Sequence, residues 1–102
     1  MRFDKPLPKE PKEFEWDLGK EFINISKHGV NFHQARQAFN DEFRIVTDNP
    51  IKDRTEVRYY CYGLVDGRIM AVRFTIQNDR IRIIGAAYWR KGRKIYESRS
   101  KH

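Results

Sequence analysis

Apolar residues near the start of the chain recur at the spacing of a helix. Asp17 is a favourable N-cap residue and Gly29 a favourable helix stop, so the pattern predicts a helix over residues 18–28. Three apolar side chains share one face of it at i, i+4 and i+7: Leu18, Phe22 and Ile25. The opposite side is polar and ends in His28. We expect the apolar face to pack against the rest of the protein.

A second helical pattern follows directly. Asn31 can cap it, and Gln34 three residues later forms a loose capping box. This helix is predicted to end near Asn40. Its apolar face is made of four residues: Phe32, Ala35, Ala38 and Phe39.

The pattern then changes to short runs rich in β-branched and aromatic residues, which are typical of strands. Four strands are predicted: 43–48, 57–64, 69–76 and 80–87. Asp66-Gly67 is a strong hairpin signal, and Asn78-Asp79 is a plausible second turn. Residues 49–56 read as a loop, and the chain becomes helical again from about Lys91. The predicted fold is therefore α+β, with two N-terminal helices, a four-stranded antiparallel meander and a short C-terminal helix.

Side chains alternate along a strand, so two-residue turns also fix which residues share a face. They pair Tyr60 with Arg73 and Thr75 with Arg82. One face is apolar and is expected to pack against the helices: Tyr59, Cys61, Met70, Val72, Phe74, Ile76, Ile81 and Ile83. The other face is basic and aromatic: Arg58, Tyr60, Tyr62, Arg73, Thr75, Arg80 and Arg82.

The basic face has two interpretations. Like charges on adjacent strands repel one another, and a phosphate backbone laid across them would offset that repulsion. Tyrosines between arginines also suit stacking on unpaired bases. The alternative is an ordinary solvated sheet face.

Charge is distributed unevenly along the 102 residues, which carry a net charge of +7. Residues 1–27 hold six basic and six acidic residues, and residues 28–56 hold four and five. Residues 57–102 hold eleven basic and three acidic residues, so the whole basic excess lies in the second half. This distribution favours a polyanionic partner, either nucleic acid or an acidic protein.

Several classes of protein are disfavoured. The longest apolar runs are far too short to cross a membrane. The N-terminal segment lacks the apolar core of a signal peptide, and one cysteine makes no disulfide framework, so we expect a cytoplasmic protein. Three prolines among charged residues predict an extended arm over residues 1–13, followed by a single domain over 14–102.

Other chemically active side chains receive simpler interpretations. Cys61 is expected to be a small core residue, and His33 a surface residue. Trp89 is expected in the core, with stacking on a base as the alternative. One cysteine and three scattered histidines do not have the spacing of a metal site, so we expect no metal and no cofactor.

A set of short motifs resembles the BrnT-type toxins of the BrnT/BrnA type II toxin–antitoxin systems. The matching segments are "FEWD" (14–17), Lys20, Asn24, "KHGV" (27–30), Phe32, Ala35, "F-x-D" (39–41), "RIRII" (80–84) and "KIYE" (94–97). The resemblance implies a RelE-like fold with metal-free endoribonuclease activity. It also implies a ribbon-helix-helix antitoxin as partner, and operator DNA binding only through the toxin–antitoxin complex.

The chain departs from the family pattern at two places. Where relatives usually show "SAR" after the last strand's "RII", this chain has "GAA", so Ala87 occupies the arginine position. Where relatives tend to carry a glutamate early in the last helix, it has "KGRK", which includes Gly92. If that arginine is catalytic in relatives, three outcomes follow: this chain is a weaker enzyme, or Arg90 or Arg82 takes the place of the arginine, or the chain no longer cuts RNA. In the last case it is a catalytically silent module that binds nucleic acid or an acidic protein.

RNA can be cut without metal when its own 2′-hydroxyl attacks the adjacent phosphate. Arginines suit binding of the phosphate and stabilisation of its extra charge, and a histidine suits proton transfer near neutral pH. The candidate catalytic residues are His28, Lys27, Arg58 and Arg82, and the candidate RNA-binding residues are Arg73, Tyr60, Tyr62, Arg80 and Arg90. The simpler reading of His28 is a helix end, where the dipole favours a cation by about 0.3–1 kcal/mol.

Overall fold

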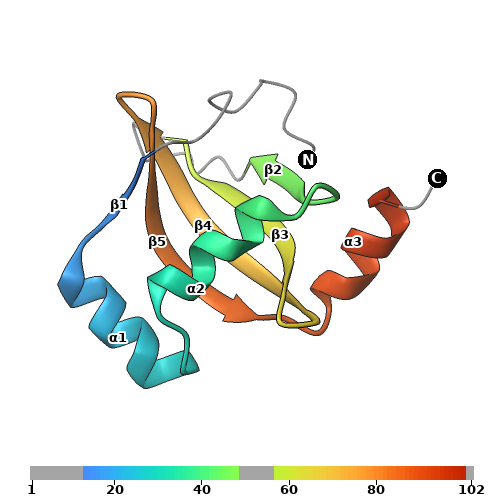
Figure 1. The fold of residues 1–102 in the computed structure, drawn as a ribbon, viewed down its shortest axis with the longest axis horizontal. Coiled ribbons are helices and arrows are strands. Elements are labelled where there is room, and N and C mark those ends of the chain that lie inside the picture. The colour runs from blue at the N-terminus through green and yellow to red at the C-terminus, as the bar shows by residue number, and fades with distance from the viewer. Residues whose placement is uncertain (1–12, 49–56, 101–102) are drawn as a thin grey trace.

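The computed structural model describes residues 13–48 and 57–100, which form an α+β fold around a five-stranded sheet (Figure 1). The strand order is β1-β5-β4-β3-β2. The strands are β1 (Phe14–Trp16), β2 (Ile45–Asp48), β3 (Tyr59–Val65), β4 (Arg68–Gln77) and β5 (Arg80–Tyr88). The helices in these ranges are α1 (Leu18–His28), α2 (Phe32–Arg36), the 3₁₀ helix η1 (Gln37–Asn40) and α3 (Gly92–Ser100).

The predicted α+β class and the antiparallel meander of four strands are confirmed. Both turns form where expected, and Asp66, Gly67, Asn78 and Asp79 all have positive φ. The predicted cross-strand pairs are present, including Tyr60 with Arg73. The register of the meander therefore follows from its two-residue turns.

The prediction of a purely antiparallel four-stranded sheet is wrong, because β1 adds a fifth strand parallel to β5. The backbone N–H of Ile81 donates to the carbonyl of Glu13 (3.1 Å), and Phe14 lies opposite Ile81. A three-residue strand has too few positions to show a period of two. Its partner lies more than sixty residues away, so no turn signal marks the pairing either.

The main core lies between one face of the sheet and the α2–η1 segment, which crosses in front of the strands in Figure 1. The predicted apolar face of the second helix is confirmed, since Phe32, Ala35 and Ala38 are fully buried. The core is made of these residues: Val30, Phe32, Ala35, Ala38, Phe39, Cys61, Val65, Met70, Val72, Phe74, Ile81, Ile83 and Ala86. η1 approaches β3 very closely, because a Cβ at Gly63 would lie 2.3 Å from the Ala38 carbonyl oxygen.

The predicted helix over residues 18–28 forms as α1, with Asp17 accepting a hydrogen bond from the Lys20 N–H and Gly29 in the left-handed conformation. The expectation that its apolar face packs on the core is wrong. Leu18 is 75% exposed, Phe22 72% and Ile25 44%. The α2–η1 segment already covers the core face, so α1 lies against β5 and turns its polar side to the protein. Periodicity identifies the apolar side of a helix, but it does not determine which side faces inward.

Polar contacts hold α1 in this orientation. Glu21 accepts hydrogen bonds from the Trp16 indole N–H (3.2 Å) and from the Phe32 backbone N–H (2.9 Å). Asn24 is the buried residue of the helix and bonds to backbone groups of Val30 and Ala86. Glu21 and Asn24 therefore do the anchoring that the apolar stripe was expected to do.

α3 packs against the other face of the sheet through a smaller cluster built around Tyr62, Ile69 and Tyr96. The Tyr96 hydroxyl donates to Asp41 Oδ2 (2.6 Å), which ties the helix to the turn before β2. α3 covers only part of this face, and the remainder contains the candidate site.

Two predictions concern residues outside the described ranges. The loop at 49–56 and all but the last residue of the predicted arm (1–13) lie there. Glu13, the last residue of that arm, pairs with Arg80 (Nε to Oε1, 2.6 Å). Among the residues that the structure describes, no helix combines the length and apolar character needed to cross a membrane.

Candidate nucleic-acid site

A pocket of about 420 Å³ opens on the basic and aromatic face of the sheet, beside the C-terminal half of α1. It brings together four of the predicted site residues, His28, Tyr60, Tyr62 and Arg73. Its other lining residues are Asn24, Ala71, Gly85, Ala86, Ala87, Tyr88 and Trp89. None of the described lining residues is acidic, so the pocket suits an anion.

A β-bulge in β5 determines which of its residues reach the pocket. Phe74 pairs with Ile83, but the adjacent Arg73 pairs with Gly85, so Ile84 is the extra residue. Simple alternation from Ile83 would have turned Ala87 toward the main core. The bulge reverses the alternation, and Gly85 and Ala87 line the pocket instead.

Arg73 of β4 is paired with Gly85 of β5, and its side chain lies next to Gly85. A Cβ built on Gly85 would lie 3.4 Å from Arg73 Nη2 and 3.6 Å from Asn24 Oδ1. The guanidinium group thus lies beside the α1 anchor, in space that a side chain larger than a methyl group at Gly85 would enter. A planar, permanently charged group at this point can bind a phosphate through two hydrogen bonds.

Asn24 fixes α1 relative to the sheet, and thereby fixes the place of His28. Its Nδ2 group donates to the carbonyl oxygens of Val30 (2.9 Å) and Ala86 (2.8 Å), and its Oδ1 accepts from the Ala86 N–H (3.1 Å). His28 lies one turn further along the same side of the helix and lines the pocket. His28 is therefore both the end of a helix and a member of the pocket.

Aromatic rings form one wall of the pocket. Tyr60 and Tyr62 stack with ring centroids 6.0 Å apart, and the ring centroids of Tyr62 and Trp89 are 5.6 Å apart. Burial raises the pKa of the Tyr62 hydroxyl, although a hydrogen bond with Thr47 opposes the shift. The expectation that Trp89 belongs to the core is wrong, because it is 38% exposed and lines the pocket. The alternative, a ring available for stacking on a base, fits its position.

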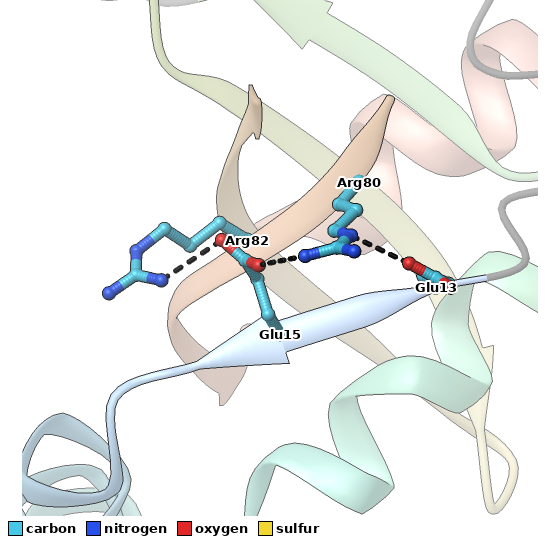
Figure 2. A network of polar contacts seen from close by, with 4 residues as sticks. All are labelled: Glu13, Glu15, Arg80 and Arg82. Atoms are coloured by element: carbon cyan, nitrogen blue, oxygen red, sulfur yellow. Dashed lines mark hydrogen bonds and ion pairs between the residues drawn. The ribbon is translucent and has the colours of Figure 1, made fainter. Parts of the chain in front are cut away.

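Two of the predicted arginines lie elsewhere and have acidic partners on β1 or directly before it (Figure 2). Arg80 Nε lies 2.6 Å from Glu13 Oε1, and Arg82 Nη1 lies 3.0 Å from Glu15 Oε2. Glu15 also lies 3.7 Å from Arg80 Nη1, so the four side chains form one network. The parallel strand β1, which sequence reasoning missed, carries Glu15, and Glu13 directly precedes it.

The other predicted residues also lie outside this pocket's lining. Arg58 is half-buried just before β3, and Lys27 is exposed on α1. Arg90 lines a separate pocket, described below. Cys61 is fully buried, as predicted, and burial raises the pKa of its thiol to about 12. In residues 13–48 and 57–100 no group of histidine, cysteine and acidic side chains is arranged to hold a metal ion.

Sequence reasoning did not identify Asn24 as an anchor or Gly85 as part of the site, and it named Trp89 only as an alternative stacking ring and Ala87 only as the family arginine position. For Asn24 a signal was available, because it is an uncharged polar residue on a helix whose other sides are apolar or charged. Strand alternation could not place Gly85 and Ala87 in the pocket, because a bulge inside a strand follows from tertiary packing rather than from a local motif.

The fold and the pocket define a small α+β protein with a basic, aromatic pocket suited to an anionic ligand. The family model described as "Ribonuclease toxin, BrnT, of type II toxin-antitoxin system" matches residues 16–92. The chain belongs to this family of ribonuclease toxins, and the resemblance found in the sequence motifs is thereby confirmed. A search of curated proteins finds no match to the chain. Membership of a type II toxin–antitoxin family implies an RNA substrate and an antitoxin partner.

Proposed function

We propose that the chain is a metal-independent endoribonuclease whose active site is the pocket between α1 and the sheet. The observation that carries this proposal is that one pocket brings His28, Arg73 and two stacked tyrosines together. These are a proton-transfer group, a phosphate ligand and a surface for bases, which are the parts that RNA cleavage without metal requires.

The proposed reaction uses the substrate's own nucleophile. The 2′-hydroxyl oxygen attacks the adjacent phosphorus and loses its proton, the bond from phosphorus to the 5′-oxygen breaks, and that oxygen receives a proton. The products are a 2′,3′-cyclic phosphate and a free 5′-hydroxyl. His28 performs one of the two proton transfers, and Arg73 stabilises the charge that gathers on the phosphate oxygens.

The family also supports a protein partner for this toxin. We propose that this antitoxin is a ribbon-helix-helix protein, and that the pair acts in the cytoplasm. Operator DNA is bound through the antitoxin in the complex. Expression of the toxin alone should slow bacterial growth and lower bulk translation, and co-expression of the antitoxin should restore both.

The test of the active site is cleavage of a synthetic RNA in EDTA by the wild type, His28→Ala and Arg73→Ala. We expect the wild type to yield cyclic-phosphate ends, and each variant to lose at least about 100-fold in rate. The matched controls are His33→Ala and Arg36→Ala, since both residues are exposed on α2 outside the pocket. A strand of the same sequence with 2′-deoxyribose at every position lacks the nucleophile and should resist cleavage. Cleavage by the wild type that requires Mg²⁺, or equal loss in the controls, would contradict the proposal.

A second function is favoured by one specific observation. Ala87 lines the pocket at the position where the resemblance places an arginine. A pocket without that arginine could hold RNA without cutting it, as a silent binding module does. Tight binding with no cleavage in the wild type would support this alternative.

A further inference from the structure

A second pocket, of about 410 Å³, adjoins the first near the end of β5. It is lined by Arg68, Ile69, Tyr88, Trp89, Arg90 and Arg93. Tyr88 and Trp89 line both pockets, so the two are neighbours on the surface. A polymer lying in the first pocket could therefore continue into the second.

The second pocket is strongly basic. Its three arginines come from three different segments: Arg68 from the start of β4, Arg90 from the turn after β5, and Arg93 from α3. None of its described lining residues is acidic. Glu97 contacts Arg93, but through Nε at 2.9 Å, and both side chains are largely exposed to solvent. Three positive charges therefore line this pocket, and the one acidic contact described does not balance them. A bound anion would relieve their mutual repulsion.

Local packing holds the aromatic residues that the two pockets share. The Arg68 guanidinium carbon lies 4.0 Å from the centre of the Tyr88 ring. The Trp89 backbone N–H donates to the Ile69 carbonyl (3.0 Å), and a Cβ at Gly92 would lie 2.9 Å from Trp89 Cε3. The absence of a side chain at Gly92 thus lets the start of α3 pack directly against the indole. The ring is fixed beside both pockets and still partly open to solvent.

We propose that the second pocket is a phosphate-binding subsite for a neighbouring nucleotide of a single-stranded RNA. Arg68 and Arg90 contact the backbone of that nucleotide, and Trp89 stacks on the base that lies between the two pockets. The inference rests on the proposed function of the first pocket and extends it. The substrate is then an RNA of several nucleotides, and a dinucleotide fills the first pocket only.

The test uses uncleavable 2′-deoxy oligomers, a dinucleotide and a hexanucleotide, titrated into the Trp16→Phe protein. Trp89 is then the only tryptophan, because the chain has two. We expect the hexanucleotide to quench its fluorescence. Introducing Arg68→Ala and Arg90→Ala together into the Trp16→Phe protein should weaken hexanucleotide binding at least about tenfold and leave dinucleotide binding unchanged. The slope of the logarithm of the binding constant against the logarithm of the salt concentration should become shallower by about 1.4, as expected for two lost phosphate contacts on a single strand.

The matched control is Lys20→Ala with Arg36→Ala, which removes the same charge from exposed positions outside both pockets. The melting temperatures of all variants are measured to show that each is folded. Equal weakening by the control pair, or no weakening by the arginine pair, overturns the subsite. If RNA cleavage by the first pocket persists in that case, the proposed function survives without the subsite. If the wild type neither binds nor cuts RNA, both are overturned.

Discussion

Tyr96 in α3 donates a 2.6 Å hydrogen bond to the carboxylate of Asp41, fifty-five residues earlier in the chain. The same carboxylate accepts from the backbone N–H groups of Leu64 (2.8 Å) and Phe43 (2.9 Å). Burial alone would raise the pKa of Asp41. The hydrogen bond from Tyr96, those from the two backbone groups and the charge of Arg44 outweigh burial and lower it. This one side chain joins the C-terminal helix to the meander.

We expect Tyr96→Phe to lower the free energy of unfolding at neutral pH by about 1.5–3 kcal/mol, the usual worth of a hydrogen bond to a charged group. The folded-state pKa of Asp41 is depressed, so this stabilisation is fully present above its ordinary value of 3.8 and is lost as the pH falls below it. Urea unfolding of both proteins from pH 7 downward should show the difference shrinking in that range. A difference that stays constant on acidification would show that the effect is packing rather than the hydrogen bond.

The same pair predicts a change at alkaline pH. Burial, together with the bond to Asp41 and its charge, raises the pKa of Tyr96 to about 12. The proton is therefore held more tightly in the folded state, and the stabilisation is present below pH 10 and lost as the pH rises from 10 to 12. The wild type should lose stability more steeply than Tyr96→Phe over that interval.

The orientation of α1 predicts a contrast between two phenylalanines. Phe22 is 72% exposed and Phe32 is fully buried. Phe22→Ser should change the free energy of unfolding by less than about 0.5 kcal/mol, whereas Phe32→Ala should cost about 3–5 kcal/mol. Chemical denaturation of both variants measures this. A large cost for Phe22→Ser would mean that α1 packs through its apolar stripe after all.

Local sequence signals predicted much of this fold because they act over a few residues. Asp17 and Asn31 cap their helices, and Asp66-Gly67 sets the register of β3 and β4. The features that were not predicted all depend on contacts between distant segments. β1 is defined by β5, and α1 turns inward the side that carries Asn24 because α2 and η1 already occupy the core face.

The candidate site shows the same division. Tyr60, Tyr62 and Arg73 share the pocket because strand alternation places them on one face. Arg80 and Arg82 were assigned to that face by the same rule. They pair instead with Glu15 of the unpredicted strand and with Glu13 just before it. Alternation specifies a face of the sheet and does not specify which charges on it are already paired.

Gly85 gives a prediction about the placement of Arg73. A methyl group at Gly85 would stand 3.4 Å from Arg73 Nη2, an ordinary contact, so Gly85→Ala should retain RNA affinity. Gly85→Val adds bulk where the guanidinium lies and should displace it. We expect RNA binding to weaken at least about tenfold, because a hydrogen bond to a charged group contributes about 1.5–3 kcal/mol and a tenfold change corresponds to ~1.4 kcal/mol. Titration of RNA into both variants measures this, and the effect of Gly85→Val should disappear when Arg73 is already alanine.

Ala87 provides the sharpest test of whether the pocket is catalytic. It pairs with Ala71 across the sheet, and both small side chains line the pocket that His28 and Arg73 share. Ala87→Arg would place a second guanidinium in this pocket, at the position where the sequence resemblance puts the family arginine. One added donor for the transition-state charge is worth about 100- to 1,000-fold in kcat, so RNA cleavage should rise toward that range. Ala87→Met adds a long, unbranched side chain without charge and should give no gain, and Ala87→Arg should give none when His28 is alanine. If Ala87→Arg folds, binds RNA more tightly and cuts it no faster, the pocket binds RNA and is not where RNA is cut.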